Sequence, residues 1–305
     1  MKNKNNNKRM MKNTSIILFT CLLYACGGSG ETDTGSTINK PLPVATSATC
    51  AKAALASDSS CITINGRESI FYEPNNQLND GIAIFLHGSP GSAEKVMNIF
   101  AAKELATQYN LIALAPEGTT PVWGWQSINT EDGDNIDIEY ITELLVKVRG
   151  DYNVSSDKLY IFGYSAGGFM AYKLACNLSE QVSAIVSLAG QYRGKFSACG
   201  STTPVSIHHF HSRSDEQVPY QGRDFGAIQA VEDTIEHWRN KNGCDQTKTS
   251  TSQTGVTSTS TDTYTDSYQN CLKSVKLSKM LNVPHEAEYQ SKSLLEIYAH
   301  IFIQE

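Results

Sequence analysis

The junction at Ser165 constrains the fold more strongly than any other feature of the sequence. Residues 158–162 form an apolar run typical of a strand buried on both faces, and residues 166–176 have helical spacing. Between them, Gly163-Tyr164-Ser165-Ala166-Gly167 matches the pattern Gly-x-Ser-x-Gly, in which small residues let a strand turn sharply into a helix. Such a turn exposes the serine hydroxyl at the carboxyl end of a parallel sheet. We therefore predict that Ser165 is a nucleophile rather than an incidental serine in a glycine-rich turn.

Strand-like and helix-like segments alternate along the chain from about residue 49. The expected strands are residues 69–72, 81–86, 111–116, 158–162, 182–188 and 205–210. The expected helices are residues 94–109, 137–152, 166–176, 227–238 and 288–303. This alternation predicts an α/β fold with a mainly parallel sheet and helices on both faces.

A Ser/Thr-rich stretch interrupts this pattern at residues 247–266. Threonine recurs at nearly every second position from Thr257 to Thr265. One interpretation is a disordered insert. We favour a polar hairpin that turns near Gly255 and is tied at its base by Cys244 and Cys271, because threonine favours strands and the period is that of a strand.

The first 26 residues have the features of an export signal. Residues 1–13 hold five Lys or Arg and no acidic residue, and an apolar run follows that is too short to span a membrane as a mature helix. The run ends in Leu23-Tyr24-Ala25-Cys26, which resembles the lipobox of bacterial lipoproteins, where the signal is cut before a cysteine that becomes diacylated. Gly27, rather than aspartate, follows this cysteine, so the analogy places the protein at the outer membrane, facing the periplasm or the cell surface. The alternative is an ordinary signal peptide with an incidental cysteine.

These features divide the chain into three expected parts. Residues 1–25 are the lipoprotein signal peptide. Residues 26–48 are rich in Gly, Ser, Thr and Pro and nearly free of large apolar side chains, which predicts a flexible tether. Residues 49–305 are the catalytic domain, held at the membrane through the lipid on Cys26.

The cysteines suit an exported protein. Of the eight cysteines in the chain, Cys21 leaves with the signal and Cys26 would carry the lipid. The others are Cys50, Cys61, Cys176, Cys199, Cys244 and Cys271. An even number in an exported chain predicts disulfides, and six cysteines allow about 15 pairings. We favour the sequential pairing 50–61, 176–199 and 244–271, because each pair brackets one local loop or hairpin.

Charge and motifs exclude two classes of function. The formal net charge is -6, which disfavours nucleic acid as a partner because phosphate binding requires clustered Lys and Arg. The sequence holds no metal-ligand pattern of the CxxC or HExxH kind, so no metal site is predicted.

A serine nucleophile needs a base, and the base needs an acid that orients it. In folds with this serine turn the chain order is serine, acid, histidine. His285 lies in a loop between a strand candidate and the last helix, where such a fold places its catalytic histidine. The other histidines after Ser165 lie on or beside the strand at 205–210 or inside helices: His208, His209, His211, His237 and His300. We therefore predict His285 as the base.

Asp215 is the predicted acid. It follows the strand at 205–210 within the loop His211-Ser212-Arg213-Ser214-Asp215. Asp224 is the rival, although its position suits the start of the helix expected at 227–238 better.

The oxyanion formed during acyl transfer needs two backbone N–H donors. One belongs to the residue after the nucleophile, Ala166, and the other to the loop after an early strand. That loop reads His87-Gly88-Ser89-Pro90-Gly91, and Ser89 is the expected donor. His87 precedes the nucleophile and belongs to this loop, so a structural role is expected for it.

These segments resemble esterases related to polyhydroxybutyrate depolymerases and feruloyl esterases of the α/β-hydrolase superfamily. The resemblance covers about residues 62–303. It is carried by Leu86-His87-Gly88, Ala115-Pro116-Glu117-Gly118, residues 152–176, residues 211–222 and the spacing of Cys244 and Cys271.

The resemblance implies the α/β-hydrolase fold and a serine carboxylic-ester hydrolase that works through an acyl-enzyme without a cofactor. Its substrates would be feruloyl or acetyl sugar esters, or hydroxyalkanoate esters of the polyhydroxybutyrate type. Trp123 and Trp125 would either line an acyl pocket or cap the core. The alternatives are a serine peptidase of the same fold and a catalytically inactive, surface-anchored binding lipoprotein.

The sequence departs from the family pattern at two places. Ser212 stands where the family usually has glycine in the acid loop. Pro284 precedes His285 where the family has glycine, and Glu286-Ala287-Glu288 follows where the family has Trp-Pro. The second departure affects the expected substrate more than the expected triad.

Overall fold

The computed structural model describes residues 49–74, 78–119, 124–128 and 135–303. The predicted signal peptide, the lipidation site Cys26, the tether and Trp123 lie outside the described residues. None of the described helices is both long enough and apolar enough to cross a membrane.

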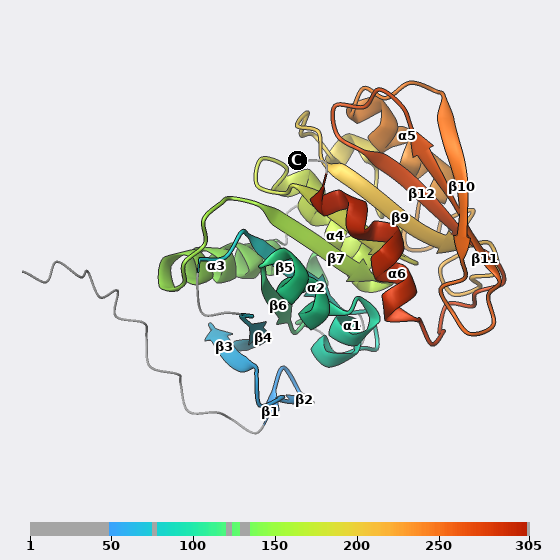
Figure 1. Cartoon of the computed structure of the whole chain (residues 1–305). Helices are drawn as coiled ribbons and strands as arrows, with labels where there is room; N and C mark the ends of the chain where they lie inside the picture. Colours follow the sequence, from blue (N-terminus) through green and yellow to red (C-terminus); the bar gives the residue numbers. More distant parts are fainter. Residues whose placement is uncertain (1–48, 75–77, 120–123, 129–134, 304–305) are drawn as a thin grey trace, which may run out of the picture. The chain divides into compact units, whose positions relative to one another are not determined.

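A twisted sheet of ten strands runs through the described residues (Figure 1). Its order is β10-β11-β12-β9-β8-β7-β5-β6-β4-β3. Pairing is parallel from β6 across β5, β7, β8 and β9 to β12, and antiparallel at both edges. The strands are β3 (Ser60–Ile64), β4 (Arg67–Tyr72), β5 (Ile82–Leu86), β6 (Ile112–Pro116), β7 (Leu159–Tyr164), β8 (Ala184–Leu188), β9 (Ser206–Ser212), β10 (Lys248–Thr254), β11 (Asp262–Tyr268) and β12 (Val275–Met280). A separate short pair, β1 (Thr49–Cys50) and β2 (Ala53–Ala54), precedes them.

Helices cover both faces of the sheet. On one face lie α3 (Ile136–Asp151), α4 (Ala166–Asn177) and α5 (Val231–Lys241), and on the other lie α1 (Ala93–Ile99), α2 (Ala102–Tyr109) and α6 (Ser291–Tyr298). Three short 3-10 helices complete the described elements: η1 (Gln126–Ile128), η2 (Phe196–Ala198) and η3 (Ala299–Phe302). This arrangement confirms the predicted α/β class with a mainly parallel sheet.

The central strands explain why their sequences are continuously apolar. In β5, Ile82, Ile84 and Leu86 enter the core beneath α3 and α4, whereas Ala83 and Phe85 enter the core beneath α1 and α2. Successive side chains of a strand point to opposite faces, and here both faces are covered by helices. Every residue of β5 is therefore removed from solvent.

The prediction of a single helix at 94–109 is wrong. The chain forms α1 and α2 instead, and Ala101 between them has a left-handed conformation, with φ of 50°. The break turns the fully buried Phe100 toward Phe85 and Phe162 in the core. Tertiary packing of one aromatic ring thus overrides the local helical pattern.

Two other helices begin later than expected. The expected helix at 227–238 begins at Val231, because residues 223–228 close a tight loop in which Arg223 and Ile228 exchange two backbone hydrogen bonds. Asp224 therefore lies in this loop and does not start the helix. The expected helix at 288–303 begins at Ser291 and ends as a 3-10 turn.

The Ser/Thr-rich stretch forms the favoured hairpin. β10 and β11 pair antiparallel from Lys248–Tyr268 to Thr254–Asp262, and β11 also pairs with β12. The disulfide Cys244–Cys271 lies at the base of the hairpin. Because β11 joins β12, this hairpin extends one edge of the sheet by two strands.

The three disulfides have the sequential pairing favoured from the sequence. They join Cys50 to Cys61, Cys176 to Cys199 and Cys244 to Cys271. The first joins the short N-terminal pair of strands to β3, and the second ties the end of α4 to the segment after η2. Disulfides of this number are typical of proteins from oxidising compartments.

Candidate active site

Ser165 occupies the sharp turn between β7 and α4. Its backbone has φ of 55° and ψ of −118°, a strained conformation for a residue with a side chain. The surrounding structure holds this conformation through three backbone hydrogen bonds. The Ser165 N–H donates to the Leu188 carbonyl of β8, and the Ser165 carbonyl accepts from the N–H groups of Gly168 and Phe169. The turn therefore presents the Ser165 side chain at the carboxyl edge of the sheet.

The two glycines of the motif allow β5, β7 and α4 to approach closely at this turn. A Cβ atom on Gly167 would lie 1.9 Å from the Leu86 carbonyl oxygen, at the end of β5. A Cβ atom on Gly163 would lie 2.1 Å from the Gly167 carbonyl oxygen. Both distances are far shorter than van der Waals contact, so any side chain at either position would displace backbone. The Gly-x-Ser-x-Gly pattern is thus required by backbone packing.

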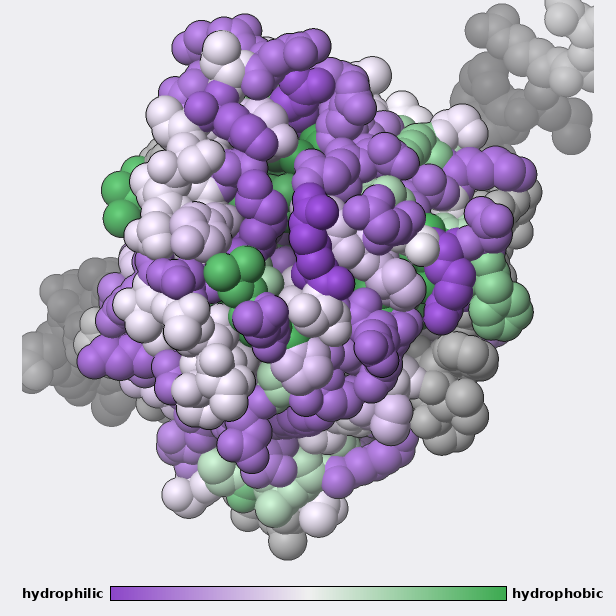
Figure 2. Space-filling model, turned by 90° about the vertical axis from the view of Figure 1, so that its right-hand side faces the viewer, coloured by the Kyte–Doolittle hydropathy of each residue, from purple (hydrophilic) through white to green (hydrophobic). Residues whose placement is uncertain are grey.

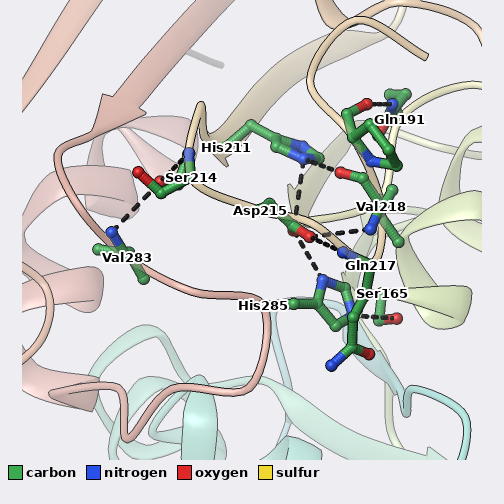
Figure 3. Close-up of polar contacts among 12 residues, drawn as sticks. Ser165, Gln191, His211, Ser214, Asp215, Gln217, Val218, Val283 and His285 are labelled. Atoms are coloured by element: carbon green, nitrogen blue, oxygen red, sulfur yellow. Dashed lines mark hydrogen bonds and ion pairs between the residues drawn. The ribbon is translucent and has the colours of Figure 1, made fainter.

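A continuous chain of hydrogen bonds joins Ser165, His285 and Asp215 (Figure 3). Ser165 Oγ lies 2.8 Å from His285 Nε2, and His285 Nδ1 lies 2.7 Å from Asp215 Oδ2. All three side chains are buried. A carboxylate only accepts hydrogen bonds, so Nδ1 carries the imidazole proton and Nε2 of the neutral ring is left to accept the serine proton. The structure therefore brings together the three residues predicted as the triad.

Backbone donors hold the Asp215 carboxylate in place. Its Oδ1 accepts from the N–H groups of Gln217 and Val218 at 3.0 and 2.8 Å. These two bonds leave Oδ2 turned toward His285. The loop after β9 thus wraps around one carboxylate oxygen and presents the other to the imidazole.

Two neighbours fix the loop that carries His285. The Tyr164 hydroxyl donates to the His285 carbonyl at 2.8 Å, and the two rings stack with centroids 5.5 Å apart. The Ser212 hydroxyl accepts from the N–H groups of Ser214 and Val283, at 3.1 and 3.2 Å, so it links the acid loop to the histidine loop. Ser212, one of the departures from the family pattern, therefore joins the two loops that carry the acid and the base.

The other departure lies at the rim of the site. Glu286, directly after His285, pairs with Lys95 of α1 at 3.0 Å. Both side chains are about half exposed. An exposed ion pair of this kind contributes little to stability, so it fixes the local surface more than the fold.

The loop expected to supply the second oxyanion donor lies against the nucleophile. A Cβ atom on Gly88 would lie 3.0 Å from the Tyr164 ring and 3.2 Å from Ser165 Cβ. The loop at residues 87–91 therefore follows the surface of the serine turn. The assignment of the Ser89 and Ala166 N–H groups to the oxyanion stays a prediction.

His87 has bonding partners that fit the expected structural role. Its Nε2 accepts from the Gly118 N–H at 2.9 Å, which leaves Nδ1 to donate to the Gly88 carbonyl at 2.7 Å. Burial is the main cause that lowers the pKa of His87, so this imidazole stays neutral. The Trp125 indole N–H donates to the His87 carbonyl at 2.9 Å.

Trp125 has no exposed surface and belongs to the core beneath α3 and α4. Its position fits the core-capping alternative better than the pocket-lining one. The remaining histidines after the nucleophile have partners other than Ser165 in the described structure: His208, His209, His211, His237 and His300.

Among the described residues, ligand atoms of Cys50, Cys61 and Glu68 lie close enough together to hold a metal ion. The two cysteines form a disulfide, so their sulfur atoms are not thiolate ligands.

Sequence reasoning missed the contacts that three residues make with the triad or its loops. Tyr164 was counted only as a variable position of the Gly-x-Ser-x-Gly motif, Ser212 as a departure from the family pattern, and His211 as a rejected base. The only sequence signal for His211 was its spacing, since His209 and His211 occupy alternate positions of a buried strand and therefore share one face.

We predict that Gly167→Ala abolishes the native turn, because the added methyl group would meet the Leu86 carbonyl. The expected result is a loss of soluble folded protein or a fall of several °C in the melting temperature, measured by circular dichroism. Gly150→Ala is the matched control. Gly150 lies in α3 with nothing within 4 Å of the added atom, so this variant should gain about 0.5–1 kcal/mol. A Gly167→Ala variant as stable as the wild type would contradict the close approach of the two backbones.

The chain is similar in sequence to known esterases. A probable feruloyl esterase C of Aspergillus clavatus is 29% identical over 170 residues, covering 53% of this chain and 59% of that protein. The bifunctional acetylxylan esterase/xylanase XynS20E of Neocallimastix patriciarum is 24% identical over 157 residues, covering 51% of this chain and 22% of that protein. The chain thus spans less than two thirds of the length of these curated relatives.

Solved structures share the fold. Acetyl xylan esterase from Aspergillus awamori matches with a TM-score of 0.59 at 16% identity, covering 79% of this chain and 98% of that chain. FphF, a fluorophosphonate-binding serine hydrolase of Staphylococcus aureus, matches with a TM-score of 0.53 at 12% identity, covering 80% and 97%. At such identities the likeness shows the fold alone.

The match to a family model is more extensive. The model described as phospholipase/carboxylesterase matches residues 73–235. This range is more than half of the chain and includes the serine turn, the acid loop and the loop at 87–91. The chain therefore belongs to the phospholipase/carboxylesterase family and has the α/β-hydrolase fold.

Proposed function

We propose that the protein is a serine carboxylic-ester hydrolase that works through an acyl-enzyme. The observation that carries the proposal is the hydrogen-bonded chain from Ser165 Oγ through His285 to Asp215, with links of 2.8 and 2.7 Å. Family membership supports ester hydrolysis as the reaction class. The strained turn at Ser165 supports its role as the nucleophile.

In the first half of the proposed reaction, Ser165 Oγ attacks the carbonyl carbon of an ester. Its proton passes to His285 Nε2, and Asp215 stabilises the imidazolium that forms. The N–H groups of Ser89 and Ala166 would hold the oxyanion of the tetrahedral intermediate, and loss of one such donor typically costs about 10²–10³ in rate. The C–O bond to the alcohol then breaks, and His285 returns the proton to the leaving alcohol.

In the second half, water hydrolyses the acyl-enzyme. His285 Nε2 takes a proton from the water as its oxygen attacks the acyl carbon. Collapse of the second tetrahedral intermediate breaks the bond to Ser165 Oγ, and His285 returns the proton to the serine. No step requires a cofactor or a metal ion.

We propose feruloyl or acetyl esters of sugars as the substrate class. The relatives named feruloyl esterase and acetylxylan esterase support this choice. β7 and β9 point toward the right-hand side of Figure 1, and Figure 2 presents this side as a mainly hydrophilic surface with small, separate apolar spots. A surface of this kind suits a polar carbohydrate ester better than an extended apolar one. Hydroxyalkanoate oligomers are the second class to test.

The test is a panel of small esters assayed with wild type and Ser165→Ala. The panel holds p-nitrophenyl acetate, p-nitrophenyl butyrate, methyl ferulate, an acetylated xylo-oligosaccharide and hydroxybutyrate oligomers. We expect the wild type to hydrolyse at least one of the sugar or hydroxycinnamate esters, and Ser165→Ala to lose at least about 10³-fold in kcat.

The control is Ser156→Ala, a serine outside the site whose hydroxyl bonds to the Asp80 carbonyl. This variant should keep wild-type turnover. Wild-type protein that is inactive on every ester would favour the inactive binding protein, and cleavage of peptides instead of esters would favour the peptidase. Full activity in Ser165→Ala would overturn the proposed nucleophile.

We also propose that the mature protein is exported and held at a bacterial outer membrane by a lipid on Cys26, with residues 26–48 as a tether. The three disulfides support an oxidising compartment. Cys26→Ala should then release the protein from the detergent phase in a Triton X-114 partition of expressing cells. A variant that still enters the detergent phase would argue against lipidation at this residue.

A further inference from the structure

Two buried histidines lie directly behind the acid of the site. His209 and His211 occupy alternate positions of β9 and share one face of the sheet, and Tyr172 of α4 lies beside them. All three side chains have no exposed surface. The proposed reaction uses none of them, yet each carries polar atoms whose burial would be costly without partners.

Short contacts join these side chains into one line. The Tyr172 hydroxyl lies 3.1 Å from His209 Nδ1, and His209 Nε2 lies 3.1 Å from His211 Nδ1. His211 Nε2 lies 2.9 Å from the Val218 carbonyl oxygen and 3.5 Å from Asp215 Oδ2. Figure 3 shows Asp215 between His211 on one side and His285 on the other.

The contact of His211 with the Val218 carbonyl fixes the direction of every hydrogen bond in the line. A carbonyl oxygen can only accept, so His211 Nε2 carries the proton and Nδ1 of the neutral ring accepts. His209 Nε2 must then donate to it, which leaves His209 Nδ1 to accept from the Tyr172 hydroxyl. Each polar atom of the two rings thus has one partner of the right kind, and the line points toward the acid loop.

The line ends on the residue whose backbone N–H holds the carboxylate. Val218 offers its carbonyl to His211 and its N–H to Asp215 Oδ1. His211 Nε2 also lies 3.5 Å from Oδ2, the oxygen that bonds to His285. Movement of the His211 ring would therefore disturb both oxygens of Asp215.

We propose that His211, held in place by His209 and Tyr172, is a positioning residue that orients the Asp215 carboxylate toward His285. The proposal rests on the proposed ester hydrolysis and names a further residue on which its rate depends. His211 touches neither substrate nor the reacting atoms. It acts through Val218 and Asp215, by keeping Oδ2 at the distance and direction that the base needs.

The histidines must be neutral for this role. The groups that face His211 are Asp215, His285, His209 and the Tyr220 ring, and those that face His209 are His211 and Tyr172. Burial lowers the pKa of His211 to about 4, and it lowers the pKa of His209 as well. A protonated His211 would compete with the imidazolium of His285 for the same carboxylate, and burial prevents this at neutral pH.

Variants of His211 with different reach test the bond to Val218. His211→Phe keeps a ring but has no donor. His211→Gln places an amide N–H near the position of Nε2, and His211→Asn reaches only to the position of Nδ1. His208→Phe is the matched control, since His208 is equally buried on the same strand but faces the opposite side, where Nε2 contacts Ser278 Oγ at 2.7 Å.

The measurement is kcat and KM against pH on the best ester of the panel, with melting temperatures for all variants. We expect His211→Phe and His211→Asn to lose about 10²-fold in kcat with little change in KM, as expected for a misplaced catalytic group. As the pH falls, these variants should lose half of their activity at a lower pH than the wild type does, because a misplaced Asp215 stabilises protonated His285 less. His211→Gln should recover most of kcat. His208→Phe should keep both the wild-type kcat and the wild-type pH at which half of the activity is lost in acid.

Three outcomes would overturn the proposal. His211→Phe could keep wild-type kcat, His211→Asn could recover activity as well as His211→Gln, or His208→Phe could lose as much kcat as His211→Phe at a similar melting temperature. Each would remove the specific role of the bond to Val218. In all three cases the wild type still hydrolyses the ester and Ser165→Ala does not, so this failure is distinct from failure of the proposed function.

A second measurement needs no variant at His211 and covers the case in which these variants do not fold. Nitrogen-15 NMR of the imidazole rings, on Ser165→Ala protein at pH 7, reports which ring nitrogen carries the proton. We expect neutral rings protonated at Nε2 for both His209 and His211. Protonation of His211 at Nδ1 would leave the Val218 carbonyl without a donor and would contradict the proposal.

Discussion

The close approach of α4 and β7 to the end of β5 is the constraint on which the rest of the site depends. It brings the Gly167 backbone against the Leu86 carbonyl and leaves no room for a side chain at either glycine of the motif. The same packing holds Ser165 in a strained conformation, with its N–H bonded to β8. Because β5 leads directly into the loop at residues 87–91, one backbone contact positions both the nucleophile and the loop expected to hold the oxyanion.

The acid and the base depend on a second set of contacts, between loops that are far apart in the sequence. Asp215 follows β9 and His285 follows β12, and the parallel pairing of these strands brings both loops to one edge of the sheet. Ser212 joins the two loops, and Tyr164 holds the backbone of His285 from the strand that carries the nucleophile. Each member of the triad is thus fixed by an element that also contacts another member, so the geometry is over-determined.

The sequence predicted what depends on local pattern. The serine turn, the buried strands, the polar hairpin and the disulfide pairs follow from short-range spacing, and the structure has all of them. The sequence did not predict the break between α1 and α2. Ala101 has no sequence signal for a helix end, and the break follows from burial of Phe100. The edge strand β3 was missed, and Asp224 was placed at a helix start that lies further along the chain. The partners of His211 could not be foreseen, because they depend on how α4 packs on β9.

The most direct test of the account is to identify the residue that a fluorophosphonate labels. The wild-type protein should carry one adduct, and tandem mass spectrometry should locate it on Ser165. Prior incubation with the preferred ester should slow the labelling, and His285→Ala should abolish most of it because the nucleophile loses its base. Wild-type protein that takes no label, or takes it on a different residue, would contradict the assignment of Ser165 as an activated nucleophile and the acyl-enzyme mechanism with it.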